Sequence, residues 1–257
     1  MARSAALVAV ALLLLMVLPA AAANPVIRAG VDLWVTVPQG TKVDFEHDPL
    51  PAGFFCTSSP AFTGKIWLRG VPLASDNPQF ARYDTIVERL DDAVFDRRGV
   101  AQTRFQVRAL QLEGIETFKN SCGEYHVQVT LDGEQPITRM RIVRETPRGG
   151  RFLVTVKINT KVVFTRIDNP AERLEFAYPV TFQPSPYHRW ELRDPRHSSE
   201  LAKATIDTDW DGSPDALIRG TSNFAAGTGD GLSFYELVDH GCHSVVYIDP
   251  PKVVFNE

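Results

Sequence analysis

The residues whose spacing best fits a defined chemistry lie in one acidic loop. Three aspartates alternate with other residues, a glycine follows, and a fourth aspartate comes four residues after the third. With one serine that would contribute its backbone carbonyl, the candidate oxygen ligands are Asp207, Asp209, Asp211, Ser213 and Asp215. Calcium takes about six to eight oxygen ligands at about 2.3–2.6 Å, and Gly212 allows the chain to turn around an ion. The spacing therefore predicts a calcium site.

The loop departs from the EF-hand pattern at its last position. Position 12, where an EF-hand has a bidentate glutamate, is Ile218. No helical periodicity flanks the loop on either side. The alternative interpretation is an acidic surface turn without a metal. We favour calcium, because carboxylates packed this closely without a cation would repel one another.

A resemblance can be stated on these residues. The pattern Asp-x-Asp-x-Asp-Gly-x-x-Asp, followed by the apolar residues 216–218, resembles the calcium loops of thrombospondin type 3 repeats and of FG-GAP or VCBS-type repeats. It covers about a dozen residues and occurs once, whereas those families use many copies. A thrombospondin type 3 loop would also have an aspartate in place of Ile218. The resemblance implies a calcium loop, and neither a propeller nor an adhesion function.

Three cysteines, Cys56, Cys122 and Cys242, allow one disulfide with one thiol left over. Three pairings are possible. We favour Cys56–Cys122, because both residues have loop-like neighbours in the same half of the chain. The alternative of three unpaired thiols stays open. His240 and His243 flank Cys242 and would allow a transition-metal or Cys–His site, although an ordinary loop or buried thiol is the preferred interpretation.

The other polar clusters point to no reaction. The sequence contains no Gly-x-Ser-x-Gly, no phosphate-binding glycine loop and no His-Glu-x-x-His. Asp91, Asp92 and Asp96 are interpreted as a solvated turn. His188 and His197 lie in an irregular segment and are interpreted as exposed loop residues rather than pocket residues.

The N-terminus indicates export. Residues 1–23 have a basic residue, an apolar run too short for a comfortable membrane span, a proline and four alanines, which is typical of a cleaved signal peptide. An uncleaved anchor is the alternative. No later apolar stretch is long enough to span a membrane, so we expect no span after cleavage. The formal net charge of −4 argues against a nucleic-acid partner, which would need a basic patch.

Period-two alternation recurs along the chain and predicts strands. The clearest segments are residues 102–112, 127–131, 140–144, 152–158 and 174–182. Turn residues separate them, and no helical pattern of ten or more residues follows residue 23. We therefore predict an all-β fold, an antiparallel β-sandwich that is either one large unit or two smaller ones. A phase change in the apolar set around Leu110 also predicts a β-bulge.

The segments are expected to be organised as a signal peptide (1–23), a β-sandwich region (24–183) and a C-terminal segment with the acidic loop (184–257). The tail packing onto the same sheets is an open alternative. The first functional hypothesis is an exported, calcium-stabilised, non-enzymatic protein that binds or supports an unknown ligand or protein outside the cytoplasm. The alternatives are an extracytoplasmic hydrolase with structural calcium and, third, a redox or metal protein using Cys242.

Overall fold

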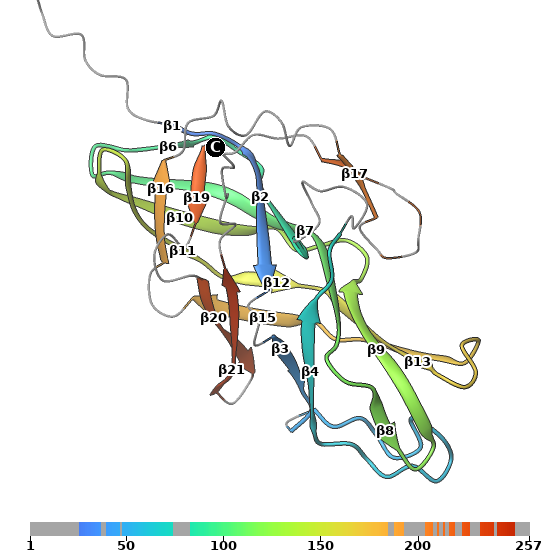
Figure 1. The fold of residues 1–257 in the computed structure, drawn as a ribbon. Helices are drawn as coiled ribbons and strands as arrows, with labels where there is room; N and C mark the ends of the chain where they lie inside the picture. Colours follow the sequence, from blue (N-terminus) through green and yellow to red (C-terminus); the bar gives the residue numbers. More distant parts are fainter. Residues whose placement is uncertain are drawn as a thin grey trace, which may run out of the picture.

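The computed structural model describes residues 26–36, 40–46, 48–73, 83–184, 188–192, 204–207, 210, 213, 216–218, 223–226, 232–238 and 241–249. Within these residues every regular element is a β-strand, and the strands form antiparallel sheets (Figure 1). The predicted all-β, antiparallel class is therefore confirmed. In this part of the chain no helix is long and apolar enough to cross a membrane.

The first sheet is built around the long strand β7 and occupies the upper part of Figure 1. The strands on one side of β7 (Val100–Gly114) are β10 (Thr138–Thr146), β11 (Gly149–Val154), β16 (His188–Leu192) and β19 (Phe224–Ala226). On the other side lie β5 (Thr85–Arg89) and then β2 (Gly30–Thr36).

The second sheet uses the C-terminal end of the same strand. There β7 lies between β4 (Lys65–Gly70) and β9 (Gly123–Leu131). The remaining strands are β3 (Thr41–Asp44) beside β4, then β13 (Thr160–Arg166) and β14 (Arg173–Ala177) beyond β9, with the short β8 (Phe118–Asn120) also on β9. Because β7 belongs to both sheets, it fixes their relative positions.

A third sheet joins the end of β2 to the C-terminal strands. Its order is β12 (Val156–Ile158), β15 (Val180–Pro184), β20 (Leu232–Val238), β21 (Gly241–Asp249) and β2. Two small pairs complete the described structure: β1 (Val26–Ile27) with β6 (Ala93–Val94), and β17 (Ala204–Ile206) with β18 (Ala216–Ile218). Of the strands after residue 184, β16, β20 and β21 pair with strands of the 24–183 region, whereas β19 pairs with β16 and β17 pairs with β18.

The bulge predicted in the second half of β7 is present. Ile86 pairs with Ala109, whereas the next residue of β5, Val87, pairs with Val107, so Arg108 is the extra residue. Phe105 and Val107 before Arg108, and Ala109, Leu110 and Leu112 after it, are all buried. One extra residue exchanges the two faces of a strand, and β7 can therefore contribute to the core on both sides of the bulge.

Two expected strands are divided. Residues 152–158 are divided between β11, which pairs with β10 and β16, and β12, which pairs with β15. The alternation over residues 174–182 predicts a single strand, but the structure forms β14 and β15, which pair with different partners, β13 and β12. Pro179 lies between them and has no N–H to donate to a ladder. The chain therefore changes sheets at this proline while the side-chain alternation continues across it.

The core lies between the sheets and contains a narrow apolar cavity of about 60 Å³. The cavity is lined by residues of β2, β3, β4, β7, β9, β12 and β15, among them Trp34, Leu68 and Ile158. A buried ion pair also crosses the core, because Arg89 donates to the carboxylate of Asp32 and its guanidinium lies 4.6 Å from the ring centroid of Phe224.

Candidate functional site

The predicted calcium loop is the turn of the β17–β18 hairpin. Ile206 pairs with Ala216 and Ala204 with Ile218, so residues 207–215 connect two strands in register. Of the candidate ligands, Asp207 and Ser213 belong to the described residues, whereas Asp209, Asp211 and Asp215 lie outside them. Ile218, which occupies the twelfth position, is a strand residue.

The start of this loop is fastened to the main sheets. The side-chain amide of Gln111, a buried residue of β7, donates a 2.8 Å hydrogen bond to the main-chain carbonyl of Asp207. Within the loop Trp210 has a φ of 62°, in the left-handed region. This conformation costs an L-residue about 1–2 kcal/mol, which is typical of a tightly wound turn.

No group of three or more His, Cys, Asp or Glu side chains in the described ranges is arranged to hold a metal ion. This finding covers the Asp91–Asp96 cluster, where each acid has its own partner. Asp91 accepts two hydrogen bonds from the guanidinium of Arg104, and Asp92 accepts from the backbone N–H of Ala29. These bonds hold the pKa of both carboxyls below the usual range. Asp96 accepts from the backbone N–H groups of Arg98 and Val100, so ion pairs and backbone hydrogen bonds together hold the acids of this cluster.

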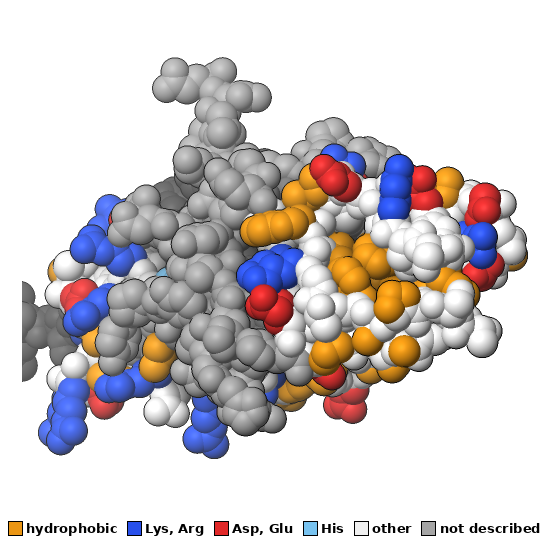
Figure 2. Space-filling model, turned by 90° about the horizontal axis from the view of Figure 1, so that it is seen from below, with side chains coloured by type: hydrophobic (Ala, Val, Ile, Leu, Met, Phe, Trp, Pro, Cys, Tyr) orange, Lys and Arg blue, Asp and Glu red, His pale blue; other side chains and the backbone are white. Residues whose placement is uncertain are grey.

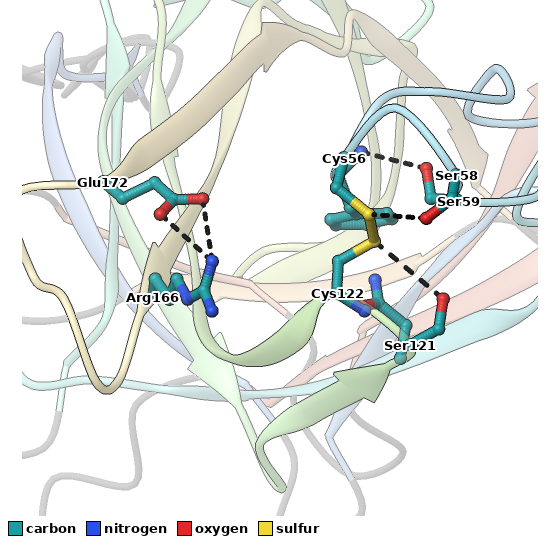
Figure 3. Close-up of a disulfide and its surroundings, with 9 residues drawn as sticks. Cys56, Ser58, Ser59, Ser121, Cys122, Arg166 and Glu172 are labelled. Carbon is teal, nitrogen blue, oxygen red and sulfur yellow. Dashed lines mark hydrogen bonds and ion pairs between the residues drawn. A yellow bond between two sulfur atoms is a disulfide. The ribbon is translucent and has the colours of Figure 1, made fainter.

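The disulfide joins Cys56 and Cys122, the pairing that the sequence analysis favoured (Figure 3). Their Cα atoms are 5.8 Å apart, and they are separated by 66 positions in the chain. Phe55 and Phe118, next to the bridge, stack with their ring centroids 4.9 Å apart. The bridge thus attaches the loop after β3 to the turn between β8 and β9. The side chains of Cys242, His240 and His243 lie outside the described residues.

His188 was interpreted as an exposed loop residue, and that interpretation is wrong. It is the first residue of β16, is buried, and packs against the ring of Phe152 at 5.4 Å between centroids. The sequence analysis did not predict this short strand, because the prolines near residue 188 are typical of irregular segments. His197 lies outside the described residues.

A groove that the sequence did not reveal lies on the outer face of the second sheet. Its volume is about 460 Å³. We call it the outer-face groove; the lining residues are Arg69, Glu113, Gly114, Ile115, Glu116, Thr117, His126, Val127, Gln128 and Thr165. Burial alternates along β4, so Arg69 and Trp67 point outward while Ile66 and Leu68 enter the core.

Strand register brings the polar residues of this groove together. Arg69 pairs with Glu113 across β4 and β7, and Glu113 pairs with Gln128 across β7 and β9. On the next strand, Thr165 pairs with His126. Directly paired residues point to the same face of a sheet, so these five side chains form two neighbouring rows above the sheet.

A glycine of β7 allows the chain to pass closely beside this groove. The pairing of β7 with β9 ends at Glu113–Gln128, and the next residue, Gly114, pairs with the core residue Leu68 of β4. A Cβ at Gly114 would lie only 2.8 Å from the carbonyl oxygen of Glu116. Glycine at this position therefore permits the close approach of the chain.

An aromatic residue borders the same face. Trp67 is 53% exposed and lies opposite Ile115, whose backbone N–H donates to the Trp67 carbonyl at 2.9 Å. The ammonium of Lys42 lies 6.0 Å from the centroid of the Trp67 ring. In Figure 2, hydrophobic side chains gather over the end of the molecule that carries β3, β4, β8 and β9, with acidic and basic side chains around them. The alternation in residues 65–70, with a tryptophan on its polar face, was the available sequence signal.

Within the groove the charged groups neutralise each other. Arg69 donates from Nε to Glu113 Oε1 at 2.8 Å, and a second guanidinium nitrogen lies 2.6 Å from the same oxygen. The arrangement offers hydrogen-bond donors and acceptors beside an exposed aromatic ring. The hydroxyl of Thr117, another lining residue, donates to the carboxylate of Glu124. A scan against protein-family models, a search of curated proteins and a search of solved structures found no match to this chain.

Proposed function

We propose that this is an exported, calcium-stabilised β-sandwich protein that binds a ligand outside the cytoplasm. The observation that carries the proposal is the position of the acidic loop. The loop connects the paired strands β17 and β18, and Gln111 fastens its first candidate ligand, Asp207, to β7. Calcium bound there would join the hairpin to the sheets. The Cys56–Cys122 bridge supports the oxidising compartment that export implies.

The outer-face groove supports binding rather than hydrolysis. A glycosidase, for example, needs two carboxyl groups on either side of the bond that it cleaves, one of them ready to donate a proton. Here Oε1 of the Glu113 carboxylate is bonded to two nitrogens of the Arg69 guanidinium. A fixed ion pair of this kind is suited to accepting and donating hydrogen bonds to a bound ligand.

The calcium proposal is tested by metal analysis and by melting the full-length mature protein with and without a chelator. Binding to the folded state alone stabilises it by about 2.7 kcal/mol at a calcium concentration of 100 Kd, which corresponds to a Tm shift of about 5–10 °C for a domain of this size. We expect the chelator to lower Tm by this amount and added calcium to restore it.

Two variants make this test specific. Asp209→Ala, which removes a candidate ligand, should melt at the chelated temperature whether or not calcium is present. Asp48→Ala removes an exposed acid outside the loop and should respond to the chelator as the wild type does. An identical melting curve of the wild type in calcium and in chelator would contradict the proposed calcium site.

A further inference from the structure

The exposed aromatic ring of Trp67, beside the outer-face groove, is the first feature that indicates which class of ligand binds there. Trp67 projects from the middle of a well-paired strand, between the core residues Ile66 and Leu68, so its position is fixed by the sheet. With 53% of the residue exposed, one large apolar surface stays in water. A flat ligand face made of C–H groups can cover an indole ring and remove that surface from water.

The polar residues beside Trp67 define what the rest of the ligand must offer. The Arg69 guanidinium only donates hydrogen bonds, the Glu113 carboxylate only accepts them, and the Gln128 amide does both. Each group is planar and presents two polar atoms in a fixed fork. Two adjacent hydroxyl groups can each donate and accept hydrogen bonds. They can therefore bind both polar atoms of one such planar group.

Charge excludes several other ligands. Arg69 is neutralised by Glu113, and the groove has a second glutamate, Glu116, but no lysine among its lining residues. Nucleic acids, phosphates and acidic polysaccharides are held by clusters of Lys and Arg. The groove therefore favours a ligand without net charge.

The geometry of the groove also argues against a protein partner. A stable protein interface buries about 800 Å² on each side around an apolar centre, whereas here the apolar groups are Trp67 and its neighbour Ile115. Addition of a peptide strand needs a free sheet edge, but β4, β7 and β9 are hydrogen-bonded to one another beneath the groove. The volume of about 460 Å³ lies within the range of about 300–1,000 Å³ for small-ligand sites.

We propose that the outer-face groove, with Trp67 at its border, binds a neutral saccharide. A sugar ring stacks its C–H face on Trp67, while hydroxyl groups of the same or the next ring bind Arg69, Glu113 and Gln128. This inference rests on the proposed binding function and specifies its ligand. It does not depend on the calcium site for its chemistry.

The test uses the calcium-loaded, full-length mature protein. Retention on cellulose, chitin and starch granules is measured first, and the affinity for the corresponding soluble oligosaccharides is then measured by calorimetry. We expect at least one neutral saccharide to bind, and Trp67→Ala to weaken its binding at least tenfold while Tm stays near the wild-type value. Trp67→Phe keeps an aromatic face and should retain affinity within a few-fold.

Matched variants separate this groove from the remaining surface. Val94→Ala removes an apolar side chain that is 62% exposed on β6 and should bind as the wild type does. Gln128→Ala should weaken binding several-fold, whereas Gln102→Ala, an exposed glutamine in the other half of β7, should not.

The inference is overturned if no neutral saccharide is retained, if Trp67→Ala binds as well as the wild type, or if only acidic polysaccharides bind and salt releases them. Its failure is distinguishable from failure of the calcium proposal, because the two have separate readouts. A chelator-sensitive Tm without saccharide binding refutes only the present inference. Saccharide binding with a chelator-insensitive Tm supports the inference and refutes the calcium site.

Discussion

The carboxyl group of Asp84 is buried, and burial disfavours its charged form. The residue is 2% exposed, and its two oxygens accept hydrogen bonds of 2.7 Å from the Thr36 backbone N–H and the Thr85 hydroxyl. Gly70 of β4 passes so close that any side chain there would collide with the Asp84 carboxylate. Burial is the main cause that raises the pKa of Asp84 to about 6, and the two hydrogen bonds oppose this rise.

This pKa makes stability depend on pH. Because the folded-state pKa is above the ordinary value of 3.8, Asp84 contributes stability that is fully present below about pH 4 and is lost as the pH rises through about 6. The difference corresponds to about 3 kcal/mol. We expect the free energy of unfolding of the wild type, measured in urea, to decrease between pH 4 and 8. In Asp84→Asn the part of this decrease that comes from Asp84 should be absent.

The control for this prediction is Asp48→Asn, which changes an exposed carboxyl and should leave the pH profile of the wild type in place. If Asp84→Asn and the wild type lose stability in parallel between pH 4 and 8, the carboxyl of Asp84 does not titrate as predicted.

The role of an individual residue could be predicted from the sequence only where the residues that act together are close to one another in the chain. The acidic loop could be proposed as a calcium site because its candidate ligands lie within nine positions of one another. Asp84 was not found, because its burial depends on the close approach of Gly70 from another strand. Similarly, the groove residues Arg69, Glu113 and Gln128 are brought together by strand register, which single-strand alternation does not determine.

At the scale of elements, the bulge in β7 is a required insertion. Deleting Arg108 would turn Leu110 and Leu112 to the opposite face of the strand, and exposing two buried leucines costs at least about 3–6 kcal/mol. We expect the deletion variant to be poorly soluble or strongly destabilised in urea. Arg108→Ala keeps the residue count and removes an ion pair with Glu88 and a hydrogen bond to the Gln106 side chain, so it should cost about 1–2 kcal/mol. Equal stability of the two variants would refute the assigned register.

The disulfide is the second element-scale prediction. Closing a loop of this length restricts the unfolded chain and contributes about 4 kcal/mol in the chain-entropy description. We expect the Cys56→Ser/Cys122→Ser variant to lose about this much in urea unfolding, and reductant to destabilise the wild type but not the variant. Cys242→Ser serves as the thiol control and should still respond to reductant. A variant as stable as the oxidised wild type would contradict this role.

Most strands were predictable as elements, and their connections were not. Alternation located the strands around residues 127–131 and 140–144, which lie inside β9 and β10 and fall short of their ends by up to four residues. It did not show that the chain changes sheets at Pro179, because the buried face continues across that residue. Alternation with period two indicates which side chains of a strand are buried. It does not determine which other strand is hydrogen-bonded to it.

For the whole molecule, the pairings predict a single cooperative unit. β7 belongs to two sheets, and β16, β20 and β21 complete sheets formed by the first part of the chain. We expect one thermal transition whose calorimetric and van't Hoff enthalpies agree, and a fragment of residues 24–183 that fails to fold alone. Two separate transitions, or a fragment with native-like near-UV circular dichroism, would instead support two independent domains.

The rows of paired residues on the second sheet also impose a length scale on whatever lies across it. Neighbouring strands are about 4.8 Å apart, so Arg69, Glu113 and Gln128 repeat at this interval from β4 to β7 to β9. That distance is close to the length of one sugar ring along a chain. The backbone hydrogen bonds of the sheet thus fix the spacing between these side chains. An elongated ligand that crosses the strands would bind best when the length of its repeating unit matches the spacing of the strands.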